Sequence, residues 1–249
     1  MIKASVFIIT KNEEKHIKRV LESVKDFDEI VIVDSGSTDN TLNIAKNYTT
    51  NITHQDFLGY SQQKEFAKNL CKNEWVLNLD ADEELSSELK NEIIKTIAND
   101  DTDALEVNIS SQYLGRFPHR LCKFITRIRF FKRSLGFYPK KLVHESIKFT
   151  GQVKKSNNFI YDYGSNELNT HIDKINAYST LRAIEKFQKH KSFSIIKLVF
   201  IFPLAFCKSY IIKRNFLNGV SGFISATNLA FYAFLKEAKL YEAYLKDKL

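Results

Sequence analysis

Several residue types are scarce in this chain of 249 residues, and their scarcity excludes whole classes of protein. There are 3 prolines and 8 glycines, too few for a collagen-like or low-complexity chain. The 3 cysteines, Cys71, Cys122 and Cys207, lie far apart and form no CxxC pair. This odd, unclustered set argues against a disulfide framework or a zinc site and predicts a reducing, cytoplasmic location. No secretory signal is expected, because the first apolar run is short and becomes charged after Thr10.

Positive and negative charges are unevenly distributed along the chain. Residues 1–100 carry 12 Lys and Arg against 18 Asp and Glu, a balance of −6. Residues 101–170 carry 12 against 6, a balance of +6, and residues 171–249 carry 13 against 5, a balance of +8. An acidic first part and a basic, aromatic last part suggest two tasks. The last part could bind an anionic membrane surface or a nucleic acid.

Strand-like and helix-like segments alternate over the first hundred residues. Short β-branched and aromatic runs at 4–10, 30–33 and 75–80 predict strands, and the segments between them show the apolar spacing of helices. Asn12 is the expected N-cap of the first helix. The alternation predicts an α/β fold with a mostly parallel sheet flanked by helices. Further strands are expected after residue 104, and a basic helical extension over 171–249 is expected to follow a domain over 1–170.

Polar residues follow each predicted strand directly. Ligands of parallel sheets bind beyond the carboxyl ends of the strands, so these residues are the candidates for a site. The three groups are Thr10, Lys11, Asn12 and Glu13, then Asp34, Ser35 and Gly36, and then Asp80, Ala81 and Asp82.

Four acidic residues crowd into the stretch WVLNLDADEEL at residues 75–85. Side chains two apart in a strand point to the same face, so Asp80 and Asp82 are expected to aim together. Two carboxylates at one spot suit Mg²⁺, which completes its shell with waters and phosphate oxygens. The alternative is a solvated strand end before a helix near Ser86, because Asp-x-Asp also occurs by chance in acidic loops.

Three motifs in chain order favour the metal site. VFIITKNEE, VIVDSGSTDNT and LNLDADEEL each close a predicted strand, and together they resemble family 2 glycosyltransferases, whose fold is called GT-A. The resemblance implies a nucleotide-sugar donor and a divalent cation, Mg²⁺ or Mn²⁺. It also implies that the nucleoside is bound by Thr10, Asn12, Glu13, Asp34 and Ser35. Asp80, beside Ala81, would contact the ribose or the metal, and Asp82 would be a metal ligand. Lys64 and Asn69 would be the family's basic residue and its Asn ahead of this strand. Ser35 replaces the second aspartate of the family's VDDGSTD, so this motif does not fix the base.

Three later segments narrow the resemblance to one branch of the family. KKLVHESIKFTG, LNTHIDKINAYSTLRAIEKF and FLNGVSGFISATNLAFYAFLKEAKLYE resemble segments of the bacterial lipopolysaccharide-core β-1,4-glucosyltransferases. This likeness implies inverting transfer of glucose from UDP-glucose to a lipid-linked oligosaccharide, the heptose-containing inner core of lipopolysaccharide. Another membrane-linked glycan or a polyprenyl phosphate is the alternative acceptor.

Inverting transfer needs a base that takes the proton from the acceptor hydroxyl. Glu145, in the VHE motif, is the candidate, and a surface ion pair with a neighbouring lysine is the alternative. His144 and His171 could support the site, bind metal or be structural. Arg127 and Arg129 could face a phosphate or an anionic acceptor, or lie solvated on a strand.

The most apolar stretch is FSIIKLVFIFPLAFCKSYIIKRNFL in the basic part of the chain. Its longest uncharged run, residues 198–207, contains Pro203 and is bracketed by Lys197 and Lys208. A spanning helix needs ~20 apolar residues, so a helix lying in the plane of an anionic membrane is expected instead. Packing against the catalytic domain is the alternative, and both can hold. The expected location is cytoplasmic and peripheral on the inner face of the membrane.

Two other classes of function were weighed against the transferase, and the sequence favours neither. A nucleic-acid-binding protein would need a basic stripe or a reader motif, and neither is found, so no nucleic-acid partner is expected. A dinucleotide-dependent oxidoreductase would need a glycine-rich turn after the first strand, and TKNEEKH contains no glycine.

Overall fold

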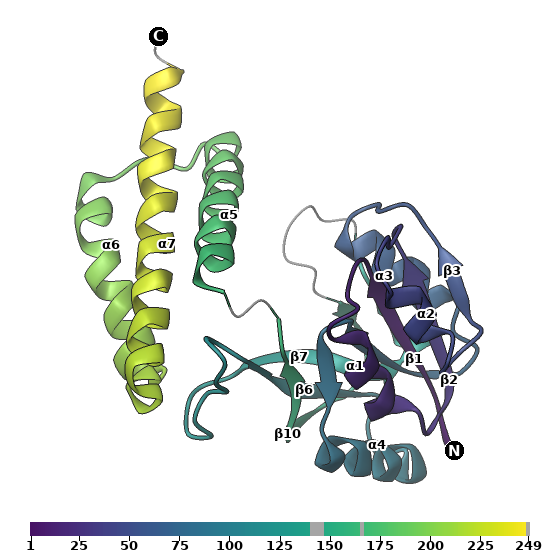
Figure 1. Cartoon of the computed structure of the whole chain (residues 1–249). Coiled ribbons are helices and arrows are strands. Elements are labelled where there is room, and N and C mark those ends of the chain that lie inside the picture. Colours follow the sequence, from purple (N-terminus) through teal and green to yellow (C-terminus); the bar gives the residue numbers. More distant parts are fainter. Residues whose placement is uncertain (140–146, 165–166, 248–249) are drawn as a thin grey trace. The chain divides into compact units, whose positions relative to one another are not determined.

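The computed structural model describes residues 1–139, 147–164 and 167–247 (Figure 1). In the first part of the chain strands and helices alternate, and the part after residue 167 is helical.

The chain divides into two compact units. The first comprises Met1–Ser110 and Phe124–Gly164, and the second comprises Ser111–Lys123 and Ser165–Leu249. The sequence pattern places the division at residue 170. It does not anticipate that Ser111–Lys123, from the middle of the chain, joins the C-terminal helices.

Four parallel strands form one half of an eight-stranded sheet in the first unit. In spatial order they are β3 (Ile52–His54), β2 (Phe27–Asp34), β1 (Ile2–Thr10) and β4 (Trp75–Asp80). Thr10 is aligned with Asp34 and Ile9 with Asp80, so the polar ends of three strands lie side by side. This alignment is the edge at which ligands of parallel sheets bind.

The other half of the sheet continues from β4 with antiparallel pairing. Its strands, in spatial order, are β7 (Ile125–Lys132), β6 (Ala104–Ser111), β10 (Val153–Asp162) and β5 (Glu83–Leu85). β7 pairs antiparallel with both β4 and β6, and β10 pairs antiparallel with β5. A separate two-stranded ribbon joins β8 (Gly136–Phe137) and β9 (Lys148–Phe149). The sheet is therefore mixed, with its parallel strands at the N-terminal end of the chain.

Helices cover both faces of this sheet (Figure 1). They are α1 (Ile17–Val24), α2 (Thr41–Ala45), α3 (Tyr60–Asn69) and α4 (Ser87–Asn99). Buried residues of α1 and α4, including Leu21 and Ile93, pack with alternate residues of β1 such as Ile8. Ala67 of α3 packs on the opposite face with Phe7. Because strand side chains alternate between faces, the continuous apolar runs of these strands can fill both cores at once.

The second unit is built around α7 (Gly219–Lys246). This helix packs against both α5 (Leu168–Gln188) and α6 (Ile195–Cys207). A π-helical turn at Lys208–Ile212 and a 3₁₀ turn at Asn215–Asn218 join α6 to α7. The segment Ser111–Lys123 is held here by hydrogen bonds that include Lys123 N to the Lys213 carbonyl at 3.1 Å, His119 N to Asn218 Oδ1 at 2.7 Å, and Asn228 Nδ2 to the Tyr113 hydroxyl at 2.8 Å.

One helical stretch in the described residues, Ile195–Ile212, is long and apolar enough by length and composition to cross a membrane. Its 18 residues have a mean hydropathy of 2.0, and 6% of the stretch is buried. The stretch is longer than the uncharged run in the sequence because the helix continues past Lys208 through the π-helical turn.

Candidate active site

The turn after β2 is held by the carboxylate of Asp34. One oxygen accepts hydrogen bonds from the backbone N–H groups of Gly36 and Ser37, both at 2.9 Å, and the Ser37 hydroxyl donates to the other at 2.5 Å. Gly36 has φ +87°, a left-handed conformation that glycine adopts without strain. The VDSG sequence therefore builds a tight turn whose acid is buried within it.

Asn12 joins the loop after β1 to this turn. Its side-chain oxygen accepts from the Thr38 N–H at 2.8 Å, and its own N–H donates to the Ser37 hydroxyl at 2.9 Å. Asn12 does not cap the first helix, which begins at Ile17 with no side-chain cap. Its φ of 56° is one that asparagine tolerates better than most residues. The predicted capping role is wrong because this asparagine is used between the two loops.

Further bonds complete a continuous polar surface of the two loops. Glu13 N donates to the Thr41 hydroxyl at 2.8 Å, and Ser35 N donates to the Thr10 carbonyl at 3.0 Å. The Ser35 hydroxyl accepts from Gln63 Nε2 at 3.0 Å. Thr10 Oγ1 is buried and has no hydrogen-bond partner among the residues that the structure describes. All five residues expected at the nucleoside, Asn12 and Asp34 included, thus belong to one connected pair of loops.

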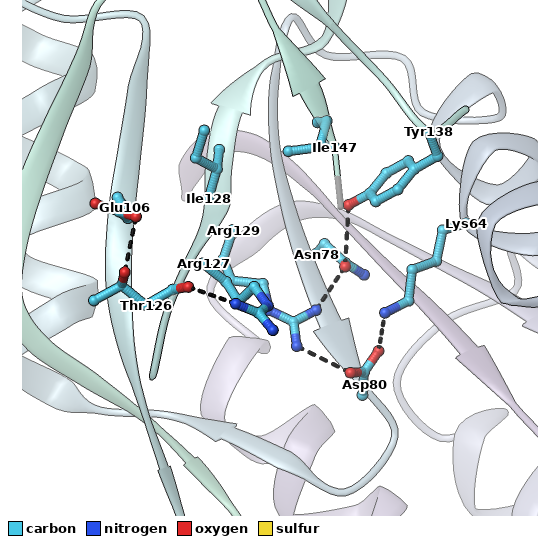
Figure 2. Close-up of a pocket in the computed structure, with 10 residues that line it drawn as sticks. All are labelled: Lys64, Asn78, Asp80, Glu106, Thr126, Arg127, Ile128, Arg129, Tyr138 and Ile147. Atoms are coloured by element: carbon cyan, nitrogen blue, oxygen red, sulfur yellow. Dashed lines mark hydrogen bonds and ion pairs between the residues drawn. The ribbon is translucent and has the colours of Figure 1, made fainter. Parts of the chain in front are cut away.

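Asp80, at the end of β4, forms ion pairs with two buried cations (Figure 2). Lys64 Nζ lies 2.7 Å from one carboxylate oxygen, and an Arg129 nitrogen lies 2.9 Å from the other. The Lys64 side chain is 3% exposed and that of Arg129 is 10% exposed. Burial opposes ionisation of Asp80, but the charges of Arg129 and Lys64 outweigh it and hold the pKa of this carboxyl well below its usual range.

Arg129 is itself held by a second acid and an amide. The nitrogen that contacts Asp80 also lies 2.5 Å from Glu83, and its other terminal nitrogen donates to Asn78 Oδ1 at 2.7 Å. Tyr138 donates to the same Asn78 oxygen at 3.2 Å. Two cations and two acids therefore share this cluster, in which burial raises the pKa of Glu83 to about 8 against the opposing charge of Arg129. Arg129 is therefore buried rather than solvated, and its two terminal nitrogens contact Asp80, Glu83 and Asn78.

The buried cluster forms one wall of a cavity of about 240 Å³ in the first unit. Ile128, Ile147 and Tyr138 supply apolar surface to this cavity (Figure 2). Arg127 also lines it but is exposed, and it donates to the Thr126 carbonyl at 3.0 Å. The cavity therefore combines polar groups, which could bind hydroxyls, with a partly apolar wall.

Asp82 has a different environment from Asp80. Burial, followed by the negative charges of Asp162, Asp80 and Glu13, raises the pKa of its carboxyl to about 7. No ion-pair partner of the Asp82 carboxylate is found within residues 1–139, 147–164 and 167–247. The backbone of Asp82 is fixed by Tyr163, whose N–H donates to its carbonyl at 2.9 Å. A partly buried carboxylate surrounded by other acids is an environment that a divalent cation would stabilise.

The described part of the chain contains no group of three or more His, Cys, Asp or Glu side chains able to hold a metal. Mg²⁺ is commonly bound through one or two protein carboxylates together with substrate phosphates. Asp82 and its acidic neighbours fit a cation held in that way, in which the diphosphate of a nucleotide completes the ligand set. They do not fit a cage made by the protein alone.

The strand argument for Asp80 and Asp82 needs correction. β4 ends at Asp80, and Ala81 and Asp82 form a turn before β5, so side-chain alternation does not extend to Asp82. The two acids still influence each other electrostatically, because Asp80 contributes to the raised pKa of Asp82. The turn separates their roles: Asp80 faces the buried cations, and Asp82 faces further acids.

Other expected site residues are placed differently. Asn69 lines a second cavity, which neither Asp80 nor Lys64 lines. Asn69 follows Lys64 by five residues on the same helix, so the two side chains point in directions about 140° apart around the helix axis. His171 belongs to the second unit, where its ring lies 4.8 Å from that of Tyr113. His144 and Glu145 lie outside the described residues.

Four residues at this site have no counterpart among the expected ones: Asn78, Glu83, Tyr138 and Asp162. Asn78 could have been identified from the sequence, because it is a polar residue in a buried apolar strand, two positions before Asp80 and on the same face. Asp162 could not, because β10 reaches this edge from a distant part of the chain.

Comparison with known proteins identifies the family. The family model described as "Glycosyl transferase family 2" matches residues 5–158, more than half of the chain. The chain belongs to glycosyltransferase family 2. It is a glycosyltransferase, as the three strand-end motifs predicted.

Two similar sequences cover nearly the full chain. An uncharacterized glycosyltransferase of Rickettsia typhi is 36% identical over 262 residues, covering 100% of this chain and 90% of the relative. The lipopolysaccharide core biosynthesis glycosyltransferase LpsC of Rhizobium meliloti is 32% identical over 253 residues, covering 96% and 92%. The resemblance to lipopolysaccharide-core enzymes is thus confirmed at the level of a named relative.

Among solved structures, TarS 1–349 of S. aureus in complex with UDP-GlcNAc has the same fold. Its TM-score is 0.53 at 18% identity, covering 98% of this chain and 92% of that one. The predicted GT-A fold of this family 2 glycosyltransferase, with C-terminal helices, is confirmed.

Proposed function

We propose that this family 2 glycosyltransferase transfers glucose from UDP-glucose, with inversion and with the help of Mg²⁺ or Mn²⁺, to a lipid-linked oligosaccharide. The observation that carries the proposal is the position of Asp82. This acid lies among further acids beside the buried cluster of Asp80, Lys64 and Arg129, at the edge where the ends of β1, β2 and β4 are aligned. A cation and a diphosphate would complete the balance of charge there.

The nucleoside would bind to the surface made by the loops after β1 and β2. Asn12, Glu13 and Ser35 carry polar groups on these loops, the buried Thr10 joins them through its carbonyl, and Asp34 holds the turn in shape. The hexose would occupy the cavity beside Asp80. Polar groups in the wall of this cavity could donate hydrogen bonds to sugar hydroxyls and accept hydrogen bonds from them.

Asp82 would hold the cation, which when bound would neutralise charge on the leaving diphosphate. Asp80 would orient this region without releasing its cations, because both of its oxygens already accept charged hydrogen bonds. Lys64 and Arg129 keep it ionised at every pH at which the enzyme would work.

Inversion requires a direct displacement in which a base removes the proton from the attacking acceptor hydroxyl. We propose Glu145 for this role, from the VHE motif. The sequence around it contains Leu142, Val143 and Ile147, and burial beside such side chains would raise the pKa of a carboxylate towards a value that suits a base near neutral pH.

The inner core of lipopolysaccharide is the proposed acceptor. The support is the 32% identity to a relative named for lipopolysaccharide core biosynthesis, over 92% of its length. Such an acceptor is anchored in lipid, which agrees with a cytoplasmic enzyme held peripherally at the inner face of the membrane. The basic charge of residues 171–249 suits such a surface.

A donor screen tests the proposal. UDP-, GDP- and dTDP-sugars are added to the full chain with and without Mn²⁺ or Mg²⁺, and the midpoint of thermal unfolding is measured. A metal-dependent rise with UDP-glucose is expected. Asp82→Ala should abolish it, whereas Asp101→Ala, which removes a surface acid 47% exposed, should leave it unchanged.

The base is tested separately from the donor site. Glu145→Gln should keep the donor-dependent rise and lose glucosyl transfer to an acceptor by about a hundredfold or more. Loss of the rise in Glu145→Gln would assign the residue to donor binding instead. Absence of a metal-dependent rise with all donors would contradict the proposed function.

A further inference from the structure

Helix α6 is apolar on two faces, and only one of them is covered within the second unit. Its inner face packs against α7 (Figure 1). On the other face, side chains at helical spacing stay 55–70% exposed: Ile195, Ile196, Val199, Phe200 and Leu204. A continuous apolar strip of this kind on a folded unit indicates a surface that binds something.

The stretch of chain that contains this strip is basic. Between Glu185 and Glu237 the chain has eight Lys and Arg and no Asp or Glu. Glu237 is 2% exposed and is paired with Lys186 and Lys197, so it offers no negative charge to a partner. From Lys186 to Lys236 the chain therefore presents apolar side chains and cations without an acid, and Glu242, further along α7, is paired with Lys246.

Aromatic rings gather where α6 turns into α7. Phe206 stacks on Tyr210 with centroids 5.2 Å apart, and Phe223 lies edge-on to both at 5.5 and 5.9 Å. Lys208, at the start of the π-helical turn between them, is exposed. Aromatic rings next to cations are typical of groups at the head-group level of a bilayer.

We infer that the exposed strip of α6, with the aromatic turn that follows it, docks in the plane of an anionic lipid bilayer. Lipid is favoured over a second copy of the chain because a copy of this surface carries the same positive charge and would be repelled. Docking in the plane is favoured over spanning because Lys197 and Lys208 interrupt the apolar stretch Ile195–Ile212. The uncharged run of ten residues between them rises only ~15 Å, about half of a ~30 Å hydrocarbon core. The inference rests on the proposed function only for its purpose, which is to bring the site to a lipid-linked acceptor.

Vesicle sedimentation with the full chain tests the surface. Vesicles of phosphatidylcholine alone are compared with vesicles that also contain phosphatidylglycerol, at low and high salt. Binding is expected to the anionic vesicles and to weaken with salt. Lys208→Gln should weaken it roughly fivefold, at ~1 kcal/mol per cation near the surface.

A matched pair of double variants tests the apolar strip. Phe200→Ser with Leu204→Ser removes side chains 55% and 64% exposed and should reduce vesicle binding by about tenfold or more. Leu181→Ser with Ile184→Ser, on α5, removes side chains 48% and 47% exposed and should leave it unchanged. Circular dichroism confirms that both remain folded.

The remaining outcomes overturn the inference. Equal losses of vesicle binding in the two double variants would show that the strip on α6 is not the lipid-binding surface. Absence of binding to either kind of vesicle would exclude lipid as the partner. Salt-independent association that only detergent reverses would indicate spanning. A dimer in vesicle-free buffer that Phe200→Ser with Leu204→Ser dissociates would indicate a second copy. The donor-dependent thermal shift, measured on the same samples, reports the proposed function separately.

Discussion

The contacts of Arg129 with Asp80 and Glu83, called the clamp below, predict how much stability Arg129→Met loses. Arg129 contacts Asp80 at 2.9 Å and Glu83 at 2.5 Å, and its side chain is 10% exposed. Removing one partner of a buried ion pair leaves uncompensated charge and typically costs about 3–5 kcal/mol of unfolding free energy. Because Arg129 serves two acids, a loss at the upper end of that range is expected, which lowers the unfolding midpoint by roughly 10 °C or more.

The assay is urea unfolding followed by the fluorescence of Trp75, the one tryptophan of the chain, which stacks on Phe130 in the same unit as the clamp. Arg127→Met is the control. It removes an exposed arginine from the same face of the same strand and should change stability by less than about 0.5 kcal/mol.

The pH dependence provides a second readout. The folded-state pKa of Asp80 lies well below its unfolded value, so its contribution to stability is present above the usual aspartate pKa and is lost as the pH falls. Arg129→Met removes the larger of the two charges that lower this pKa and leaves only Lys64. The difference in stability between wild type and variant should therefore be largest near neutral pH and shrink below about pH 4. Equal stability of the Arg129 and Arg127 variants, or a pH-independent difference, would refute the clamp.

Two further predictions concern packing and reactivity. Burial, with a smaller effect of a nearby acid, raises the pKa of Cys71 to about 12, so its thiol should resist alkylation at pH 8 until the chain unfolds. The exposed Cys207 should react at once, and mass spectrometry after iodoacetamide with and without urea distinguishes the two; rapid labelling of Cys71 would disprove its burial. A Cβ at Gly222 would lie 1.9 Å from the Asn215 carbonyl oxygen, so Gly222→Ala should destabilise the second unit by about 1–3 kcal/mol. Ser225→Ala on the same helix serves as the control in thermal unfolding by circular dichroism, and equal midpoints would contradict this packing.

Much of the fold could be predicted because the parallel strands are read locally. Each is a short apolar run ending in a polar turn, and the sheet aligns those turns, as seen for Thr10 with Asp34. The helix starts were less readable. Asn12 has the chemistry of a cap, but a partner 26 residues away, Thr38, competes for its side chain.

The electrostatics of the site could not be predicted in the same way. Alternation along β7 shows that Arg127 and Arg129 share a face, but not that one is exposed and the other buried between two acids. That difference arises from antiparallel pairing with a strand about fifty residues earlier. Ser111–Lys123 joins the helical unit through hydrogen bonds to residues about a hundred positions away, for which no local pattern exists.

The bonds between the loops after β1 and β2 have a consequence for recognition. Asn12, Ser37 and Thr38 fasten the two loops before any donor arrives, so the conformational entropy of ordering them is spent during folding. Loops that are already ordered do not change shape to improve their contacts with a poorly matched base. Under the proposed function, discrimination between nucleotides at this edge would act as a steric selection, made by a surface whose shape is already set.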